Sequence, residues 1–257
     1  MRKKGGQFLI IASLFLSLVL FSLALIMSNV AHTYISLPKT LGYNVIRNLE
    51  DDLPRALENA LALASQVKLS GGKPEESLGC FLEYMEAWRN ACFEALGGGV
   101  SIELASPQEG CDPIYFSWNR TSSFSYASLL LKVNLTGMGL EGFQTVAKVM
   151  VNLTLDRSSF VTSSSNRKTN FSFTLSDGYG EPIAFALSKP GADFKVWHWN
   201  TTESTWVVSS INSTSYAGSG RYDVCLNDYV TPYIELLVYF RDERGVVVMA
   251  SASSASP

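Results

Sequence analysis

The segment AKVMVNLTL, residues 147–155, alternates apolar and polar side chains without a break. Successive side chains of a β-strand point to opposite faces, so this period of two predicts a strand with one buried and one exposed face. LLKVNLT at 130–136 and FSFTLS at 171–176 repeat the pattern. Such alternation is typical of antiparallel sheets, in which one face packs on a core and the other meets solvent. We therefore expect mainly antiparallel β-structure after residue 99.

Turn signals divide the last third of the chain into short strands. SDGYGEP, SKPGAD, NTTEST and RDERG recur at intervals of about ten residues and are rich in the residues that favour turns. Between them lie about seven strand-like runs, the number found in an immunoglobulin-like sandwich. We therefore predict a β domain over residues 99–165 and an Ig-like β-sandwich over residues 166–257.

The chain before residue 99 has helical periodicity instead. Leucine and valine recur every four residues at Leu41, Val45, Leu49 and Leu53. Asp52 followed by Pro54 predicts a helix start, and SGGKPEE predicts a stop after it. A second amphipathic helix is expected over 76–96, with its apolar side formed by Phe81, Met85, Trp88, Cys92 and Leu96. We expect residues 28–98 to form a helical stalk, which makes the predicted fold class α+β.

Residues 8–27 contain no charged residue, proline or glycine. A helix rises about 1.5 Å per residue, so roughly 20 such residues can cross the hydrocarbon core of a bilayer. Arg2, Lys3 and Lys4 precede this segment, and the next lysine or arginine after it is Lys39. The positive-inside rule then makes residues 1–7 cytoplasmic and residues 8–27 a transmembrane helix in contact with lipid. The expected location is the cell membrane, with a single pass and the bulk of the chain outside the cell.

Potential glycosylation sites agree with this orientation. The triplet N-x-S/T occurs at Asn119, Asn134, Asn152, Asn170, Asn200 and Asn212. All six lie in the segment predicted to be outside, and three of them, Asn134, Asn152 and Asn170, fall on polar faces of predicted strands. A glycan can be carried there without disturbing the core, so we expect a glycoprotein.

The four cysteines are Cys80, Cys92, Cys111 and Cys225. An even number in an oxidising compartment permits two disulfides. If residues 76–96 form one helix, Cys80 and Cys92 are about 18 Å apart along its axis, and a disulfide requires Cα atoms within about 7 Å. Each would then pair with Cys111 or Cys225, in either arrangement. Free buried thiols are the alternative, because cysteine also behaves as a small apolar residue.

Signals for catalysis are absent from the sequence. The two histidines, His32 and His198, do not assemble a Ser/His/Asp arrangement or a His-rich metal site. Asp51 and Asp52 are interpreted as a helix cap, and no Walker loop, GxSxG or HExxH motif occurs. A net charge of -3 without a basic patch argues against nucleic-acid binding. We therefore expect no catalytic residue, no cofactor, no metal site and no enzymatic activity.

The aromatic segment VWHWNTTESTW contains Trp197, Trp199 and Trp206. Aromatic faces can stack on sugars or form an adhesive patch. Packing within the sheet is the favoured interpretation, with Trp206 across a hairpin from the other two. The sequon at Asn200 would also hinder a partner that docks there.

Three further segments carry a resemblance to known proteins: KKGGQFLIIA at 3–12, FSWNRTSSFSYA at 116–127 and YFRDERGVVVMAS at 239–251. Together with the helical region containing EAWRNACF, they resemble a group of archaeal membrane-anchored surface proteins of unknown function. The resemblance implies a helical stalk and a C-terminal Ig-like domain. From the predicted anchor and the outward-facing β-structure we expect an adhesive or envelope-structural role, with a protein or glycan partner at the cell surface.

The first residues also resemble archaeal class III (prepilin-like) signals, in which a peptidase cuts after Gly6 and leaves Gln7 as the first residue. The alternative function is therefore a type IV pilin-like filament subunit, a homo-oligomer assembled through its apolar helix. One position departs from that pattern. Pilin-like sequences usually carry glutamate at the fifth mature position, which is Ile11 here.

Overall fold

A computed structural model of the chain describes the backbone of residues 4–96, 100–108, 110–163, 168–184, 193–200, 202–227 and 235–253. Side chains at 4–16, 28–40, 157–158, 162–163 and 253 fall outside this description. The described chain contains two long helices and eleven strands, and all the named strands pair in antiparallel fashion. The α+β fold class and the mainly antiparallel sheets are thus confirmed.

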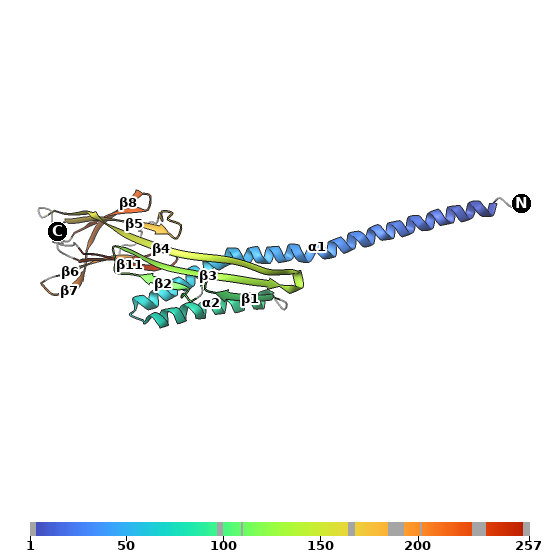
Figure 1. The fold of residues 1–257 in the computed structure, drawn as a ribbon. Coiled ribbons are helices and arrows are strands. Elements are labelled where there is room, and N and C mark those ends of the chain that lie inside the picture. Colours follow the sequence, from blue (N-terminus) through green and yellow to red (C-terminus); the bar gives the residue numbers. More distant parts are fainter. Residues whose placement is uncertain are drawn as a thin grey trace.

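Helix α1 (Lys4–Leu69) is continuous over 66 residues, which corresponds to a length of roughly 100 Å at about 1.5 Å per residue. Figure 1 shows its N-terminal part projecting from one end of a compact head, which we define as residues 42–253. The helix start predicted at Asp52 and Pro54 is wrong, because α1 runs through both residues. Proline removes one backbone hydrogen bond from a helix, but Leu53 and Leu57 on either side are buried in the head and hold the helix together.

The second half of α1 belongs to the core of the head and is not a separate stalk. Its buried leucines and isoleucine recur at helical spacing, at Ile46, Leu49, Leu53, Leu57 and Leu61. Gly42 lies against the head, since a Cβ there would clash with Leu140 Cδ1. The helical stalk expected over 28–98 is therefore corrected: from residue 42 onward its helices pack on the sheets.

Helix α2 (Pro74–Leu96) follows a tight turn and returns along α1, close to the helix predicted at 76–96. Gly71, at φ 88°, ends α1 in the left-handed conformation that glycine adopts without strain. Lys73 donates its backbone N–H to Glu76 Oε2 at 3.2 Å, as in a capping box, and Pro74 takes the first helical position. Phe81 and Met85 are buried against α1, as their spacing predicts.

The larger sheet has the strand order β1-β3-β4-β5-β9-β8, with β2 paired to β3. Its strands are β1 (Val100–Ala105), β2 (Ile114–Ser117), β3 (Ser122–Leu135), β4 (Leu140–Ser163), β5 (Lys168–Asp177), β8 (Ile211–Gly218) and β9 (Arg221–Leu226). A short 3-10 helix, η1 (Thr136–Met138), connects β3 to β4. Because β4 pairs with β5, this sheet continues across the boundary predicted at residue 165.

The smaller sheet has the order β11-β10-β6-β7. Its strands are β6 (Phe194–Asn200), β7 (Thr205–Val208), β10 (Glu235–Arg241) and β11 (Val247–Ser253). Stacked aromatic rings fill the space between the two sheets. The ring centroid of Phe173 on β5 lies 5.3 Å from that of Phe194 on β6 and 5.2 Å from that of Tyr222 on β9. The alternation read from 147–155 is confirmed, with Ala147, Val149, Val151, Leu153 and Leu155 all buried.

Candidate functional site

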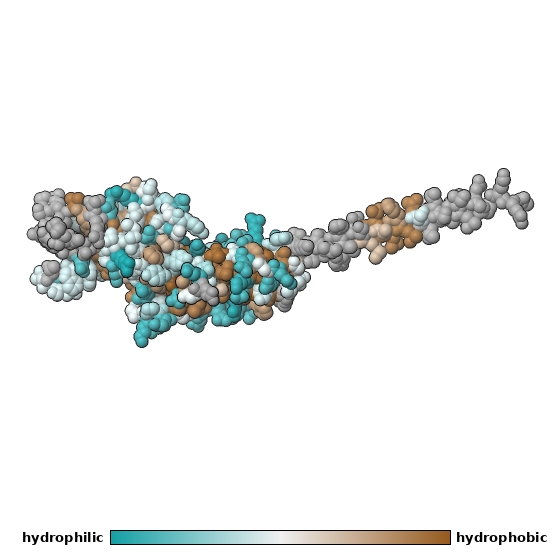
Figure 2. Space-filling model, in the orientation of Figure 1, coloured by the Kyte–Doolittle hydropathy of each residue, from teal (hydrophilic) through white to brown (hydrophobic). Residues whose placement is uncertain are grey.

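The apolar surface of projecting α1 is the most unusual feature of the molecule. Large apolar side chains stand exposed at Leu18, Val19, Leu20, Phe21, Leu23, Leu25, Ile26 and Met27. Figure 2 shows them as a hydrophobic band on the helix, away from the head, whose surface mixes hydrophilic and hydrophobic residues. Consecutive residues of a helix point in different directions, so a run of this kind surrounds the axis with apolar surface.

Polar groups in this band are satisfied within the helix. The Ser22 hydroxyl donates to the Leu18 carbonyl oxygen at 2.8 Å, so it does not require water. No helix among the described residues combines the length and the apolar character that a membrane span requires. The side chains of 8–16, nearly half of the expected span, lie outside the described residues.

Polar contacts fix the direction of α1 relative to the head. Arg244 lies in the turn between β10 and β11. Its Nη1 is 2.9 Å from Glu58 Oε1 on α1, and its Nε is 2.6 Å from Asp242 Oδ2. Asp242 is buried and also accepts the Val246 N–H at 2.8 Å. Burial raises the pKa of the Asp242 carboxyl more than the positive charge of Arg244 and the hydrogen bonds from Arg244 and Val246 lower it.

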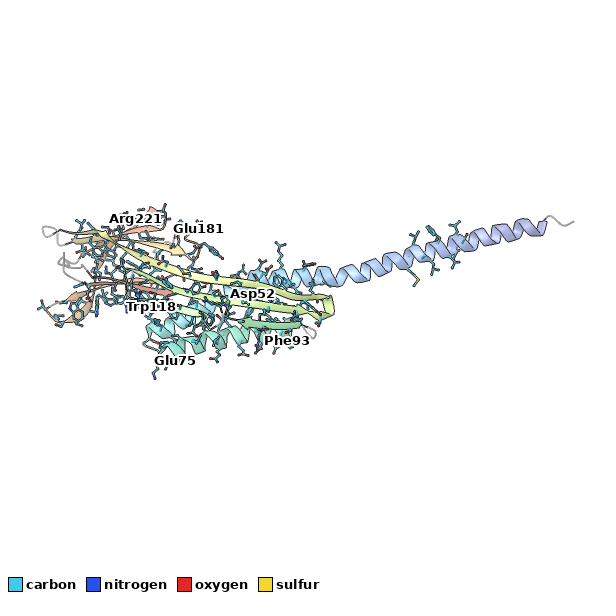
Figure 3. The ribbon with its side chains drawn as sticks, viewed as in Figure 1. Asp52, Glu75, Phe93, Trp118, Glu181 and Arg221 are labelled. Carbon is cyan, nitrogen blue, oxygen red and sulfur yellow. The ribbon has the colours of Figure 1, made fainter. Side chains whose placement is uncertain are left out.

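Two further contacts hold α1 in the head. The Ser65 hydroxyl on α1 accepts the Val247 N–H at 3.0 Å. Trp88 on α2 donates its indole N–H to Asp52 Oδ2 at 2.8 Å, and Figure 3 labels Asp52 on the part of α1 that lies along the head. Asp52 therefore joins two helices and does not cap one. The apolar segment and the head form one continuous unit with a defined axis.

The six sequon asparagines differ in accessibility. Asn119, Asn170 and Asn212 are exposed, whereas Asn134, Asn152 and Asn200 are partly buried. Asn134 Oδ1 accepts the Gly142 N–H at 2.6 Å, and Asn200 Oδ1 accepts the Thr202 N–H at 3.0 Å. Asn134, Asn152 and Asn170 lie between buried neighbours on their strands, which places them on the outward faces as the alternation predicts.

All four cysteines are free thiols in the structure, so neither expected pairing is formed. Cys80 and Cys92 lie on α2, Cys111 lies in the loop before β2, and Cys225 lies on β9. Cys92 is partly buried, and this burial, followed by the negative charge of Asp52, raises the pKa of its thiol. The free buried thiols expected as the alternative are not what the structure shows either, because Cys111 is exposed and the other three cysteines are partly buried.

The tryptophans pack against neighbours in the smaller sheet. Trp199 and Trp206 are paired across the β6–β7 hairpin, with ring centroids 5.6 Å apart. Trp197 packs edge-on against Tyr239, with ring centroids 6.3 Å apart. His198 Nδ1 lies 2.8 Å from Ser209 Oγ within the same part of the head. This arrangement agrees with the packing interpretation of the aromatic segment.

The described chain holds no cluster of three or more histidine, cysteine, aspartate or glutamate side chains placed to bind a metal. Gly6 and Gln7, the residues of the expected processing site, lie in the first turns of α1, and the Gln7 side chain is outside the described residues. The side chain of His32 is outside them as well.

Sequence reasoning missed a polar pocket on the outer face of β5, β8 and β9. It is lined by Asn170, Ser172, Ser213, Ser215, Arg221 and Asp223, among others. The alternating polar residues of each strand were visible in the sequence. The pairing that brings the three polar faces together was not, because β5 and β9 are separated by more than 40 residues along the chain.

Comparison of the chain with protein-family models, with curated proteins and with solved structures gives no significant match in any of the three.

Proposed function

We propose that this protein is a single-pass membrane protein of the cell surface, anchored by residues 8–27 of α1. The exposed apolar band from Leu18 to Met27 carries this proposal, because it projects away from the head and its consecutive apolar residues point in different directions around the helix. Burial of apolar surface is worth about 25 cal/mol per Å², so a band of this size strongly favours lipid over water.

The orientation is inferred from charge. Arg2, Lys3 and Lys4 precede the band and would stay in the cytoplasm, which puts the head outside the cell. The six sequons, all on the head, support the same orientation and a glycosylated surface.

For the head we propose an Ig-like sandwich with an adhesive or envelope-structural role and without catalysis. The strand order of the two sheets supports this proposal. In the larger sheet, the order β4-β5-β9-β8 corresponds to A-B-E-D of immunoglobulin domains. In the smaller sheet, the order β11-β10-β6-β7 corresponds to G-F-C-C′. The two strands that would be B and F, β5 and β10, contain no cysteine. Stacked Phe173 and Phe194 fill the space between the sheets instead of a disulfide.

Extraction of native membranes tests the anchor. We expect the full chain to remain in the membrane pellet at high salt and in alkaline carbonate, and to dissolve only with detergent, because hydrophobic burial is not weakened by salt. Proteolysis of intact cells should digest the head. Recovery of the full chain in the aqueous fraction without detergent, outside any filament, would contradict the proposal.

The uninterrupted helix favours a second candidate, the type IV pilin-like subunit. A flexible linker between anchor and head would leave the head free to rotate, whereas here α1 passes directly from the apolar band into contacts with Arg244 and Val247. Such a fixed axis suits a filament in which helices of many copies pack in a core. The resemblance to class III signals at Gly6 supports the same assembly.

The N-terminal residue of the native protein separates the two candidates. A filament subunit is expected to begin at Gln7 and to appear in sheared filaments, as determined by N-terminal peptide mass spectrometry. An anchored monomer is expected to keep Arg2, Lys3 and Lys4. A start at Gln7 without filaments would leave the anchor in place, since residues 8–27 survive that cleavage.

A further inference from the structure

A small pocket lies on the outer face of the larger sheet, where β5, β8 and β9 run side by side. We call it the serine pocket; its polar wall is formed by Asn170, Ser172, Ser213, Ser215, Arg221 and Asp223. Its volume is about 250 Å³. Figures 1 and 3 place β5, β8 and Arg221 in the part of the head far from the N-terminus, so a ligand could approach from the side opposite the apolar band.

Ser172 is the unusual member of this pocket. Its side chain is buried, and its Oγ has no hydrogen-bond partner among the described residues. Its backbone N–H donates to Ser159 Oγ at 2.7 Å, from the irregular part of β4 that covers this position. Buried polar groups are nearly always paired, because an unpaired one loses its bonds to water and gains nothing. An unpaired hydroxyl in a pocket wall therefore indicates a ligand that supplies the missing partner.

The chemistry of the wall limits what that ligand can be. Arg221 Nε and Asp223 Oδ1 are 3.3 Å apart and neutralise each other, so the pocket favours neither an anion nor a cation. Serine hydroxyls both donate and accept hydrogen bonds. The hydroxyl groups of an uncharged sugar, which also both donate and accept, match this combination.

The volume of the pocket also indicates a small ligand. Pockets for drug-sized ligands measure about 300–1,000 Å³, and the serine pocket is smaller. We propose that the serine pocket binds one uncharged sugar ring, a hexose or N-acetylhexosamine. This proposal goes beyond the surface role given above and does not depend on membrane insertion.

The sugar could have two sources. One is an N-glycan of the same chain, because Asn170 is itself part of the wall and Asn212 lies on the neighbouring strand. The other is a glycan on a partner. Cys225 can report on both, since it lines the pocket and its Sγ is 3.7 Å from Asn212 Nδ2.

The first experiment uses the full chain made in a host without N-glycosylation and kept in a detergent that has no sugar headgroup. Iodoacetamide modification of each cysteine is followed by peptide mass spectrometry, with millimolar glucose, galactose, mannose or N-acetylglucosamine added separately. We expect at least one sugar to slow alkylation of Cys225 severalfold. The exposed Cys111, outside the pocket, is the internal control and should react at an unchanged rate. If no sugar slows alkylation of Cys225, the proposal is wrong.

A matched pair of variants tests the role of Ser172. Ser172→Ala should abolish the protection of Cys225 without lowering the thermal unfolding midpoint, because the hydroxyl has no partner to lose in the free protein. Ser77→Ala removes another buried, unpaired hydroxyl, on α2 and outside the pocket, and should keep the protection. Asp223→Asn, at a half-exposed position, gives a second variant in the wall and should weaken protection. Protection that survives in both Ser172→Ala and Asp223→Asn would overturn the assignment.

Glycosylated protein from the native host distinguishes the two sources. If the sugar belongs to the same chain, Cys225 is protected without added sugar, and Asn170→Gln or Asn212→Gln removes the protection. If it belongs to a partner, Cys225 in the glycosylated protein reacts freely until sugar is added. Simple steric shielding by a nearby glycan is recognised because it persists in Ser172→Ala, and that result would count against the pocket.

Discussion

Two aspartates in the apolar band, Leu18→Asp with Phe21→Asp, are expected to move the protein from the membrane fraction into the aqueous fraction. An aspartate near the centre of a spanning helix costs about 2.5–3.5 kcal/mol, so the pair costs roughly 5–7 kcal/mol of insertion free energy. Both side chains are exposed and contact no residue of the head, so the head should stay folded. The measurement is the distribution between pellet and supernatant after membrane fractionation, with circular dichroism of the released protein.

Tyr43→Asp is the matched control for these substitutions. Tyr43 is also an exposed residue of α1, but it lies beyond residues 8–27, where α1 has reached the head. The control should remain in the membrane pellet. An unchanged distribution of the double variant would show that the apolar band is not what holds the protein in the membrane.

Leu57→Ala is expected to lower the free energy of unfolding of the whole head by about 3 kcal/mol, the usual effect of removing a fully buried leucine side chain. Leu57 has 0% exposure and lies on the face of α1 that packs into the head. The reason for the large effect is a cavity between the helix and the sheets, which neighbouring side chains fill only in part. Denaturant unfolding of the full chain, followed by tryptophan fluorescence, measures it.

Leu63→Ala is the control at a more exposed position of the same helix. Leu63 is 39% exposed, so its truncation should change the free energy of unfolding by well under half as much. The comparison also tests the architecture, because a stalk separate from the β-structure would unfold independently. A head whose unfolding is insensitive to Leu57→Ala would contradict the packing described for α1.

Local periodicity predicted much of the β-structure. The alternation at 147–155 was confirmed residue by residue, and helix α2 begins and ends within about two residues of the predicted range. Both signals are local, since they depend on which side chains share a face of one element. The start predicted at Asp52 and Pro54 failed because burial of Leu53 and Leu57 outweighs the hydrogen bond lost at the proline.

Long-range pairing explains the other differences. Residues on the two sides of the boundary predicted at 165 belong to one sheet, because β4 pairs with β5. The number of cysteines permitted two disulfides, but the four residues lie on α2, in the loop before β2 and on β9, where the fold leaves them as free thiols. Neither fact has a local signature, since side chains that meet in space are chosen by packing between distant segments.

The sequence by itself determined the α+β class, the alternation of the strands and the apolar character of residues 8–27, because composition and period are properties of neighbouring residues. Only the tertiary structure decided that α1 continues from that segment into the core of the head. The same holds for the serine pocket around Ser172, which exists because three strands from distant parts of the chain present polar faces side by side. Burial, which sets the environment of each side chain, depends on the whole fold.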